Sequence, residues 1–316
     1  MFEIEGFNAS RAEEWNDFVA HSKNGTFLFD RHYMDYHADR FADHSLLFSD
    51  NSGIFALLPA HLQGTTLVSH GGLTYGGLIT NEHATVEKVT ALFTELNVFL
   101  SSLGIERVVY KAIPWIFHRY PSEEDLYALF SVCHARLMAR DASATILLDH
   151  PLPWRRDHRY GAKKALEKGL NVERSDDFEG FWQVLTTNLV NKYGAQPVHT
   201  IEEIRLLKER FPQQIQLFTV SKEGQLVAGT VLYLCGHVAH AQYISANEEG
   251  KRLHAIDLLF NHILHHELES FKFFDFGKST ENLGKTLNAT LASQKEGFGA
   301  RAVCYDWYEW DVPPSR

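Results

Sequence analysis

Apolar residues recur at intervals of three and four along several stretches of the chain, which predicts amphipathic helices. The clearest are expected over residues 12–19, 86–100, 178–189 and 253–268. The last of these has the longest apolar series, formed by Leu253, Ile256, Leu259, Phe260, Ile263, Leu264 and Leu268. Helices of this kind bury one face against a sheet or another helix, so the pattern indicates a layered fold.

Polar residues mark where further helices begin. Ser10 and Thr200 each precede a glutamate by three positions, which is the capping-box pattern, and both predict a helix N-terminus. The sequence Asn-Glu-Glu-Gly at 247–250 predicts a turn before the helix at 253–268. Weaker periodicity predicts four more helices, over residues 31–41, 123–138, 162–169 and 281–291.

Short apolar runs bounded by turn residues predict strands. In the first half of the chain these runs span residues 45–48, 54–59, 65–69, 107–113 and 144–148. In the second half they span residues 215–220, 226–234, 238–244 and 271–276. Each half has a strand, a tight turn, two more strands, a loop containing glycine, a helix and another strand. This common order predicts a structural duplication.

The composition is that of a folded, soluble protein. The 316 residues are 45% hydrophobic and 22% charged and suit two domains of ordinary size. Pro-Leu-Pro at 151–153 sets the expected boundary between a domain at 1–152 and one at 153–316. No apolar run approaches the roughly 20 residues that span a bilayer. The acidic start lacks a signal-peptide pattern, and the three cysteines are far apart, so a reducing, cytoplasmic location is expected.

The balance of charge limits the partners. The formal net charge of −10 argues against DNA and against any broad phosphate-binding surface. The sequence still allows a local basic groove, because one dense basic cluster contains Arg155, Arg156, Arg159, Lys163, Lys164 and Lys168.

Two short motifs near the C-terminus carry a family resemblance. They are Asp-Phe-Gly at 275–277, followed by Ser279 and Glu281, and Lys-Glu-Gly-Phe-Gly at 295–299. The chain resembles the GNAT-type N-acyltransferases, and more closely their FemABX-like branch, which holds two GNAT-like domains in one chain. The resemblance extends over nearly the whole chain. It implies an α/β protein, with α+β mixed sheets, built from two tandem GNAT-like domains.

The resemblance also implies where an acyl donor binds. In the GNAT family the donor lies between two strands that splay apart, and the coenzyme A diphosphate sits at a helix N-terminus, where free amides and the helix dipole favour an anion. The matching helix is expected near Leu253. The predicted donor site comprises Ile244, Gly250, Lys251, Arg252, His254 and Ala255. His254 stands where the family pattern has glycine, so a differently shaped site or another donor stays open, as does a plain solvated turn.

The predicted catalytic residues are Lys295, Phe298 and Glu248. Acyl transfer to an amine requires a bound donor, a neutral amine and a stabilised oxyanion. In FemABX-like enzymes the matching lysine lies at the reaction centre beside the matching aromatic residue. We expect Phe298 to pack against the stem of Lys295 and exclude water, so that the ammonium stabilises the oxyanion. Glu248 is a candidate base. The alternative for Lys295 is an exposed lysine in a loop after the last helix.

The predicted acceptor site draws on both halves of the chain. Tyr75 and Gly76 belong to a glycine-rich loop that an acceptor could approach closely. Lys192 and Tyr193 lie where relatives place a basic residue against an acceptor phosphate. The acceptor site is completed by Ser279 and Glu281.

Two alternatives concern the donor and a metal. Many FemABX-like enzymes take their donor from aminoacyl-tRNA, but no long heptad arm is present and the net charge is negative, so tRNA is disfavoured and acetyl-CoA or another acyl-CoA is preferred. His262 and His266 have a spacing that can bind a metal, yet no glutamate stands in the arrangement of a zincin. We expect no metal.

The sequence therefore predicts a cytoplasmic acyltransferase. It would move an acyl or aminoacyl group to an amine of a sugar, a nucleotide-sugar or a cell-wall or surface-polysaccharide precursor. The alternatives are an aminoacyl-tRNA-dependent peptidoglycan peptidyltransferase and a catalytically silent binding module of the same fold. The oligomeric state stays open.

Overall fold

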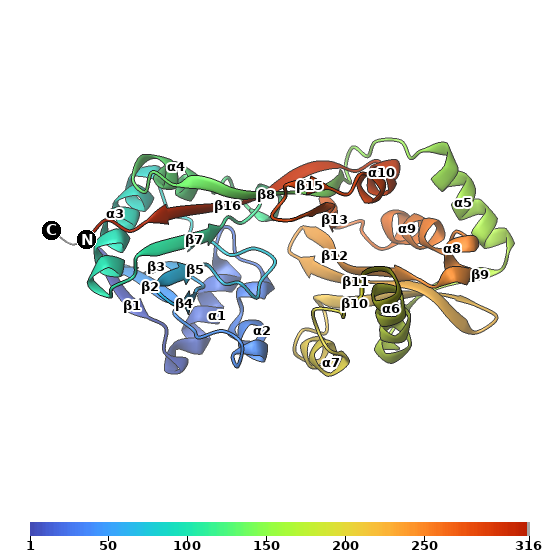
Figure 1. Ribbon diagram of the computed structural model, residues 1–316, viewed down its shortest axis with the longest axis horizontal. Helices are drawn as coiled ribbons and strands as arrows, with labels where there is room; N and C mark the ends of the chain where they lie inside the picture. The colour runs from blue at the N-terminus through green and yellow to red at the C-terminus, as the bar shows by residue number, and fades with distance from the viewer. Residues whose placement is uncertain (315–316) are drawn as a thin grey trace. The chain divides into compact units, whose positions relative to one another are not determined.

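The computed structural model describes residues 1–314, except for the side chain of Tyr193. The chain folds into two compact units (Figure 1). The first contains Met1–Ala142, Thr280–Thr286 and the chain from Cys304 onward, and the second contains Ser143–Ser279 and Leu287–Val303. Both units combine helices with a mixed sheet. The domain boundary at residues 152 and 153 stays a prediction.

The first unit holds two sets of strands. One is an antiparallel sheet in the order β1-β2-β3-β6. The other runs β4-β5-β7-β16-β8, with β5 and β7 parallel. The bounds are β1 Glu3–Gly6, β2 Leu46–Asp50, β3 Gly53–Leu58, β4 His61–Gln63, β5 Thr66–Val68, β6 Ile79–Thr80, β7 Arg107–Lys111, β8 Arg136–Leu147 and β16 Arg301–Asp311. β8 enters the second unit at Ser143, and β16 begins there.

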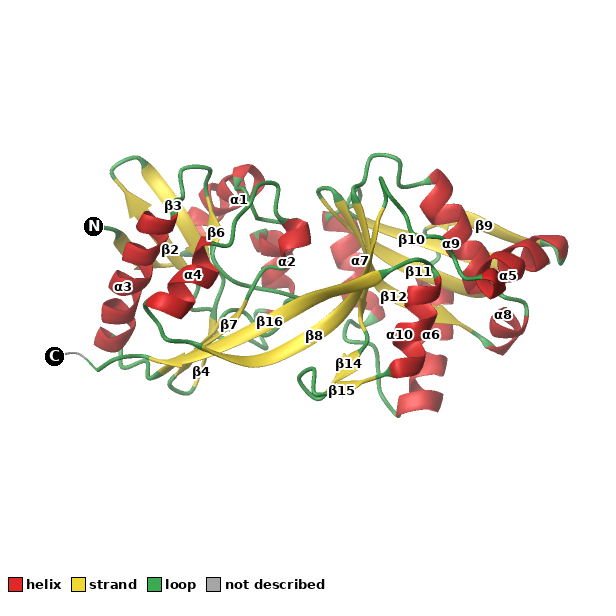
Figure 2. Ribbon diagram, turned by 90° about the horizontal axis from the view of Figure 1, so that it is seen from above, coloured by secondary structure: helices red, strands yellow, loops and turns green. Residues whose placement is uncertain are grey.

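Helices cover these strands. They are α1 Ala12–His21, α2 Arg31–Met34, α3 Val86–Ser102 and α4 Glu124–Ser131. α3 and α4 lie side by side (Figure 2). The buried face of α3 has the spacing that the sequence predicts, and its residues are Val89, Leu92, Phe93, Leu96 and Leu100. They pack on Phe48 and Tyr110 in the core of this unit.

The second unit is a sheet with helices on both faces. Its strands run β8-β13-β12-β11-β10-β9. Helices α5 and α9 cover one face, and α6 and α7 cover the other (Figure 1). The strand bounds are β9 Leu170–Ser175, β10 Ile215–Lys222, β11 Gln225–Cys235, β12 Val238–Ala246 and β13 Phe273–Lys278. The helix bounds are α5 Arg156–Glu167, α6 Phe178–Tyr193, α7 Ile201–Arg210, α8 Glu248–Arg252, α9 Ala255–His266 and α10 Ala289–Gly297.

The structure confirms one predicted capping box and corrects the other. The Thr200 side chain accepts from the Glu203 amide at 3.2 Å, and Glu203 accepts from the Thr200 amide at 2.9 Å. At the N-terminus Ser10 caps nothing. Asn8 accepts from the Ser10 amide instead, at the start of a short 3-10 helix that precedes α1. The capping box at Ser10 is therefore wrong.

The turn predicted at 247–250 is wrong, because these residues begin a helix. Asn247 is the N-cap of α8 and accepts from the Gly250 amide at 2.8 Å. Gly250 is glycine for a packing reason, since an added Cβ would lie 2.4 Å from the carbonyl oxygen of Val227. An asparagine followed by two glutamates is a helix-start signal, and it outweighs the turn signal here.

The helix predicted over 281–291 is also wrong. Asn282, Leu283 and Gly284 all have positive φ, at 53°, 56° and 79°, which an α-helix does not allow. The segment instead forms a two-stranded hairpin, with β14 at Thr280–Glu281 and β15 at Thr286–Leu287. The last helix, α10, begins only after Asn288, whose side chain accepts from the Leu291 amide.

Two other predicted helices are shorter than expected. The segment 31–41 contains α2, which ends at Met34, and one 3-10 turn. The segment 123–138 contains α4, which ends at Ser131, before β8 begins at Arg136. Beyond α2, Phe41 contacts the rings of His61 and His70, and beyond α4, Val132 and Ala135 pack on the core of the first unit. The local pattern does not reveal these tertiary contacts.

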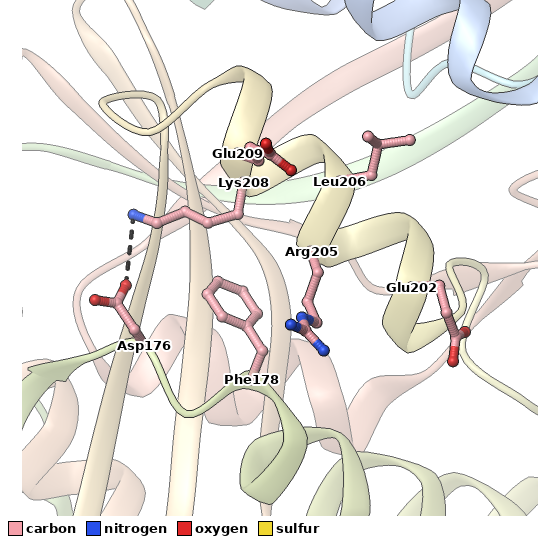
Figure 3. A pocket seen from close by; sticks show the side chains of 7 residues that line it. All are labelled: Asp176, Phe178, Glu202, Arg205, Leu206, Lys208 and Glu209. Carbon is pink, nitrogen blue, oxygen red and sulfur yellow. Dashed lines mark ion pairs between the residues drawn. The ribbon is translucent and has the colours of Figure 1, made fainter.

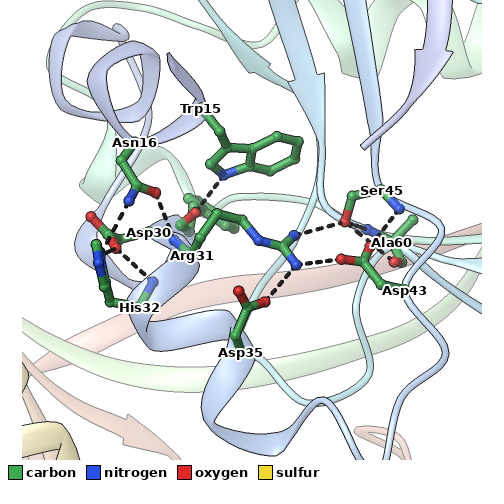
Figure 4. Close-up of polar contacts among 10 residues, drawn as sticks. Trp15, Asn16, Asp30, Arg31, His32, Asp35, Asp43, Ser45 and Ala60 are labelled. Carbon is green, nitrogen blue, oxygen red and sulfur yellow. Dashed lines mark hydrogen bonds and ion pairs between the residues drawn. The ribbon is translucent and has the colours of Figure 1, made fainter. Parts of the chain in front are cut away.

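A buried arginine fixes the segment around α2 (Figure 4). The Arg31 side chain is 5% exposed. Its guanidinium donates to Asp35 and Asp43 and lies 3.8 Å from the centre of the Phe7 ring. Burial raises the pKa of Asp43, but Arg31 and Ser45 outweigh this and lower it. The buried charge is therefore neutralised by two carboxylates, which ties α2 to the loop before β2.

Three histidines cluster in the first unit beside Phe41. The ring centres of His37 and His70 are 5.3 Å apart, and those of His61 and His70 are 5.8 Å apart. Burial lowers the pKa of His37 to about 4 and that of His70 to about 3. Both rings are therefore neutral in the folded protein near neutral pH.

We predict that this cluster makes folding stability fall with acid. Below about pH 6.5 each of His37 and His70 binds a proton in the unfolded chain but not in the folded one. The free energy of unfolding should therefore fall by about 2 kcal/mol per histidine between about pH 6.5 and about pH 5. Urea denaturation at these two pH values measures the fall. His37→Asn with His70→Asn should flatten the pH dependence, whereas exposed His83→Asn should not. An equal fall in all three proteins would contradict the prediction.

Candidate active site

Two neighbouring strands of the second unit separate after a short parallel pairing. β12 and β13 pair only at Val238 with Phe273, Ala239 with Phe274 and His240 with Asp275. On its other edge, β12 stays paired with β11 as far as Ala246. The register of that pair shifts at Gln242, which indicates a β-bulge. An opening therefore lies between β12 and β13, as expected for a pair of splayed strands.

A pocket of about 440 Å³ occupies this opening. Such a volume suits a small-molecule site. Five of the residues predicted from the sequence line it together, and these are Ile244, Lys192, Lys251, Lys295 and Phe298. The other lining residues are mostly apolar and are Leu185, Asn188, Leu189, Ser245, Ala246, Ile256, Phe260, Phe276, Leu291 and Gln294. The structure thus brings together lysines from three helices and an aromatic wall.

Lys295 lies on α10, whereas the sequence places it in a loop. Its side chain is 6% exposed. The Nζ atom donates to the carbonyl oxygens of Gly277 and Lys278 at 2.8 and 2.7 Å. An ammonium group has three N–H donors, so one remains for a group in the pocket.

The charge state of Lys295 is set by two opposing effects. Burial lowers its pKa to about 8, and the negative charge of Asp275 acts in the other direction. Near neutral pH the group is therefore mostly an ammonium ion, but it loses its proton at a lower pH than a surface lysine does. Such a group can donate to a developing oxyanion in a site where little water competes.

Phe298 is the centre of an aromatic cluster. It is 2% exposed and stacks on Phe276 with ring centres 5.5 Å apart. It also contacts His158 at 4.1 Å, Trp154 at 4.9 Å and Phe260 at 5.4 Å between ring centres. The cluster forms the floor of the pocket and holds α10 against β13.

The charges on α8 are already paired with one another. Lys251 Nζ donates to Glu248 at 2.7 Å and to Asn188 Oδ1 at 2.8 Å. Arg252 donates to Glu249 at 3.4 Å. The Glu248 side chain is 91% exposed, and it does not line the pocket. The first turn of α8 thus carries two carboxylates beside its two cations, an arrangement that fits a coenzyme A diphosphate poorly.

The start of α9 is also occupied by side chains. His254 adopts φ 60°, the left-handed conformation that glycine takes without strain. Its Nδ1 lies 3.1 Å from Asp257, and His158 Nδ1 lies 2.6 Å from the same carboxylate. Ala255 is fully buried. A carboxylate therefore lies in the first turn of α9. It lines a hollow of about 260 Å³ together with the predicted donor residues Gly250, Lys251 and His254.

Four predicted acceptor residues lie apart from the pocket lining. Tyr75 is buried in the first unit, where its hydroxyl lies 3.0 Å from Thr26 Oγ1. Gly76 has Ser69 so close that an added Cβ would clash with it. Glu281 is exposed on β14 of the first unit. Ser279 is buried at the end of the second unit's β13 segment. Their part in acceptor binding stays a prediction, and the side chain of Tyr193 lies outside the described residues.

Sequence reasoning missed two polar residues of the pocket. Asn188 donates to Ser245 Oγ at 3.3 Å and accepts from Lys251, so it joins α6, β12 and α8. Gln294 precedes Lys295 on α10 and lines the same pocket. A helical projection of 289–297 would have placed Gln294 beside Leu291, but the chain there carries no strong apolar period.

Among residues 1–314, no three histidine, cysteine or acidic side chains are grouped as in a metal site. His262 and His266 have ring centres 5.4 Å apart, and His262 Nε2 lies 3.2 Å from Glu267. Within the same residues, no helix combines the length and apolar character needed to cross a membrane.

A second hollow of about 520 Å³ lies beside α7 (Figure 3). Its walls are charged surface side chains such as Arg205 and Glu202, with an ion pair of 3.9 Å between Lys208 and Asp176. None of the predicted site residues lines it. Screened surface charges around an open hollow give little binding energy, so the pocket between β12 and β13 is the better candidate.

Comparisons with known proteins agree with this geometry. Residues 154–283 match the family model described as an acetyltransferase (GNAT) domain. The structure of FemX matches with a TM-score of 0.69 at 11% identity, covering 98% of this chain and 97% of that one. A tandem GNAT protein from the clavulanic acid biosynthesis pathway matches with a TM-score of 0.53 at 11% identity, covering 100% of both chains.

A third similar structure is the C-terminal domain of a putative lysylphosphatidylglycerol synthetase from Agrobacterium fabrum. Its TM-score is 0.62 at 14% identity, covering 96% of this chain and 92% of that one. No curated protein matches the sequence. The predicted α/β fold with two tandem GNAT-like domains is confirmed.

We predict that Phe298 holds the pocket together. Phe298→Ala would empty the centre of the aromatic cluster and should lower the free energy of unfolding by about 3–5 kcal/mol. Phe130→Ala is the matched control, because Phe130 is 76% exposed and its removal should change stability by less than about 0.5 kcal/mol. Chemical denaturation measures both. A loss below about 1 kcal/mol for Phe298→Ala would show that the cluster is dispensable.

Proposed function

We propose that this protein, which belongs to the GNAT superfamily and has the FemABX-like tandem fold, is an N-acyltransferase with its reaction centre in the pocket between β12 and β13. The observation that carries the proposal is Lys295. Its ammonium is buried at the open edge of the splayed strands, and two backbone carbonyls orient it. A buried cation at this point suits a reaction in which negative charge develops on a carbonyl oxygen.

In the proposed reaction, the nitrogen of a neutral acceptor amine attacks the donor carbonyl carbon. The carbonyl oxygen becomes an oxyanion, which accepts a hydrogen bond from the remaining N–H of Lys295. The bond to the leaving group then breaks, and the proton lost by the amine goes to the leaving oxygen or sulfur. Lys295 thus binds and stabilises the oxyanion, and it need not give up its own proton.

None of the described residues that line the pocket is a carboxylate that could act as a base. Its lining contains three lysines, and the predicted base Glu248 pairs with Lys251 instead. The amine must therefore lose its proton before it attacks, or pass it to the leaving group. Positive charge from Lys192, Lys251 and Lys295 would favour the neutral form of a bound amine, because like charges disfavour an ammonium.

For the donor, we favour an aminoacyl ester such as aminoacyl-tRNA over coenzyme A. Acyl-CoA is the donor that the sequence favours, and the GNAT fold supports it. The paired charges of α8 and the carboxylate of Asp257 weigh against a diphosphate at these helix starts. The resemblance to FemABX-like enzymes supports an ester donor and an amine of a cell-wall precursor as acceptor. A sugar or nucleotide-sugar amine is the second candidate acceptor.

We predict that Lys295→Met lowers turnover by about a hundredfold or more, because the oxyanion loses its charged donor. Methionine keeps the unbranched stem, so folding should persist. The measurement is transfer of a labelled aminoacyl group from aminoacyl-tRNA to an amine acceptor. Lys88→Met is the control, because Lys88 lies exposed on α3 of the first unit, outside the basic cluster. Turnover within about twofold of wild type would remove Lys295 from the reaction. No transfer by the wild type from either donor class would instead favour a silent binding module.

We predict that coenzyme A binds the wild type weakly and binds Glu248→Gln with Glu249→Gln more tightly. The double substitution frees Lys251 and Arg252 from their ion pairs, and each freed cation should contribute about 1 kcal/mol to a diphosphate contact. Calorimetry with coenzyme A measures the affinity, and Glu82→Gln with Glu87→Gln is the control. Tight binding by the wild type, with no gain in the variant, would restore coenzyme A as the favoured donor.

A further inference from the structure

We infer that Asp275 is a positioning residue for Lys295, acting through the β-bulge at Gly277, near the end of β13. The inference deepens the proposed function and rests on it, because it explains how the reaction centre keeps its cation in place. Asp275 does not line the pocket. It lies at the last residue pair before β12 and β13 separate.

The Asp275 carboxylate is fully buried and accepts hydrogen bonds at both of its oxygens. Oδ1 accepts from Ser143 Oγ and Thr145 Oγ1, both at 2.7 Å. Oδ2 accepts from His240 Nδ1 at 2.7 Å and from the Gly277 amide at 3.2 Å. Burial raises the pKa of Asp275, but these donors outweigh burial and lower it. The carboxylate is therefore an anion in the core of the second unit.

The same carboxylate shapes the β-bulge whose carbonyls hold Lys295. Gly277 adopts φ 75°, and its amide points back to Asp275. This conformation directs the carbonyls of Gly277 and Lys278 toward α10, where they accept from Lys295 Nζ. Asp275 is thus connected to Lys295 by the hydrogen bond to the Gly277 amide, the β-bulge, and the two hydrogen bonds from Lys295 Nζ. β8 and β12 support it from either side through Ser143, Thr145 and His240.

Asp275 has a second role, because its charge affects the protonation of Lys295. Asp275 raises the pKa of Lys295 against the effect of burial. Lys192 of α6 and Lys251 of α8 line the same pocket and have the same sign of charge as Lys295. His240 of β12 contacts Asp275 from the opposite side. Without the Asp275 charge, burial would favour a neutral Lys295 amine, which stabilises an oxyanion poorly.

The first experiment needs no substrate. Protein labelled with ¹³C at lysine Cε is titrated by NMR, and the Lys295 signal is assigned from its loss in Lys295→Met. Asp275→Asn keeps the shape of the side chain and removes its charge, so the Lys295 titration should move down by about one pH unit or more. Ser143→Ala removes one hydrogen bond and keeps the charge, so it should move the titration by less than half as much. Asp257→Asn is the matched control, because Asp257 is also buried and bonded to a histidine. An unmoved titration in folded Asp275→Asn would overturn the inference.

The second experiment measures turnover against pH. In the wild type, kcat should fall above about pH 8, where Lys295 loses its proton. In Asp275→Asn this fall should begin about one pH unit lower, with KM little changed. If the NMR titration of Lys295 shifts but the pH dependence of kcat does not, Asp275 still positions Lys295, but Lys295 has no role in the reaction. The two experiments therefore separate a failure of this inference from a failure of the proposed function.

A second variant tests the same inference if Asp275→Asn does not fold. Gly277→Ala keeps the carboxylate, but alanine is strained at φ 75°. Its Cβ would lie 3.4 Å from His240 Cε1, an ordinary contact, so the backbone conformation is the main change. The displaced carbonyls should lower kcat by about tenfold or more while KM changes little. An unchanged kcat would show that the β-bulge at Gly277 does not position Lys295.

Discussion

The site depends on the point at which β12 and β13 stop pairing. Parallel strands satisfy each other's N–H and C=O groups along their whole length when they remain side by side. Here the ladder ends at His240 and Asp275, while β12 continues along β11 to Ala246. One edge of β12 is therefore free of a partner strand over its last residues. The side chains of four helices close around that edge and form the pocket.

The polar groups at this point do several tasks at once. Asp275 ends the ladder, satisfies the amide of Gly277 and compensates for a buried cation. Ser143 and Thr145 supply hydroxyl donors to it from β8. A buried carboxylate with fewer donors would take up a proton or destabilise the fold, because desolvation of a charge is costly. The number of donors around Asp275 is therefore what makes a charged centre compatible with an apolar core.

Much of the second unit could be predicted from local sequence. The apolar series from Leu253 to Leu268 is strong enough to identify α9, and Thr200 with Glu203 fixes the start of α7. The family resemblance predicted Ile244, Lys192, Lys251, Lys295 and Phe298 as site residues, and the fold places all five around one pocket. Lys192 and Ile244 lie on elements with clear local signals, whereas the sequence predicted a turn at Lys251 and a loop at Lys295, where the structure has α8 and α10.

Other features depend on contacts that no local pattern contains. Leu283, Leu287 and Leu291 have helical spacing, yet Gly284 lies so close to the Arg140 backbone that only a tight hairpin fits. The helix start at Asn247 resembles a turn until Gly250 is seen against β11. The donors to Asp275 come from positions 143, 145 and 240, which only the completed sheet brings together. The spacing of residues along the sequence does not reveal contacts between such distant positions.

The path of the chain has a consequence for synthesis. Within the first unit, β16 lies between β7 and β8, yet its residues from Cys304 onward follow the whole second unit along the chain. Many multidomain proteins complete one domain while the rest is still being translated. Here the ribosome must deliver all of the second unit before the sheet of the first unit gains β16. Until then β7 and β8 each present an unpaired edge, the kind of surface that chaperones shield in nascent chains.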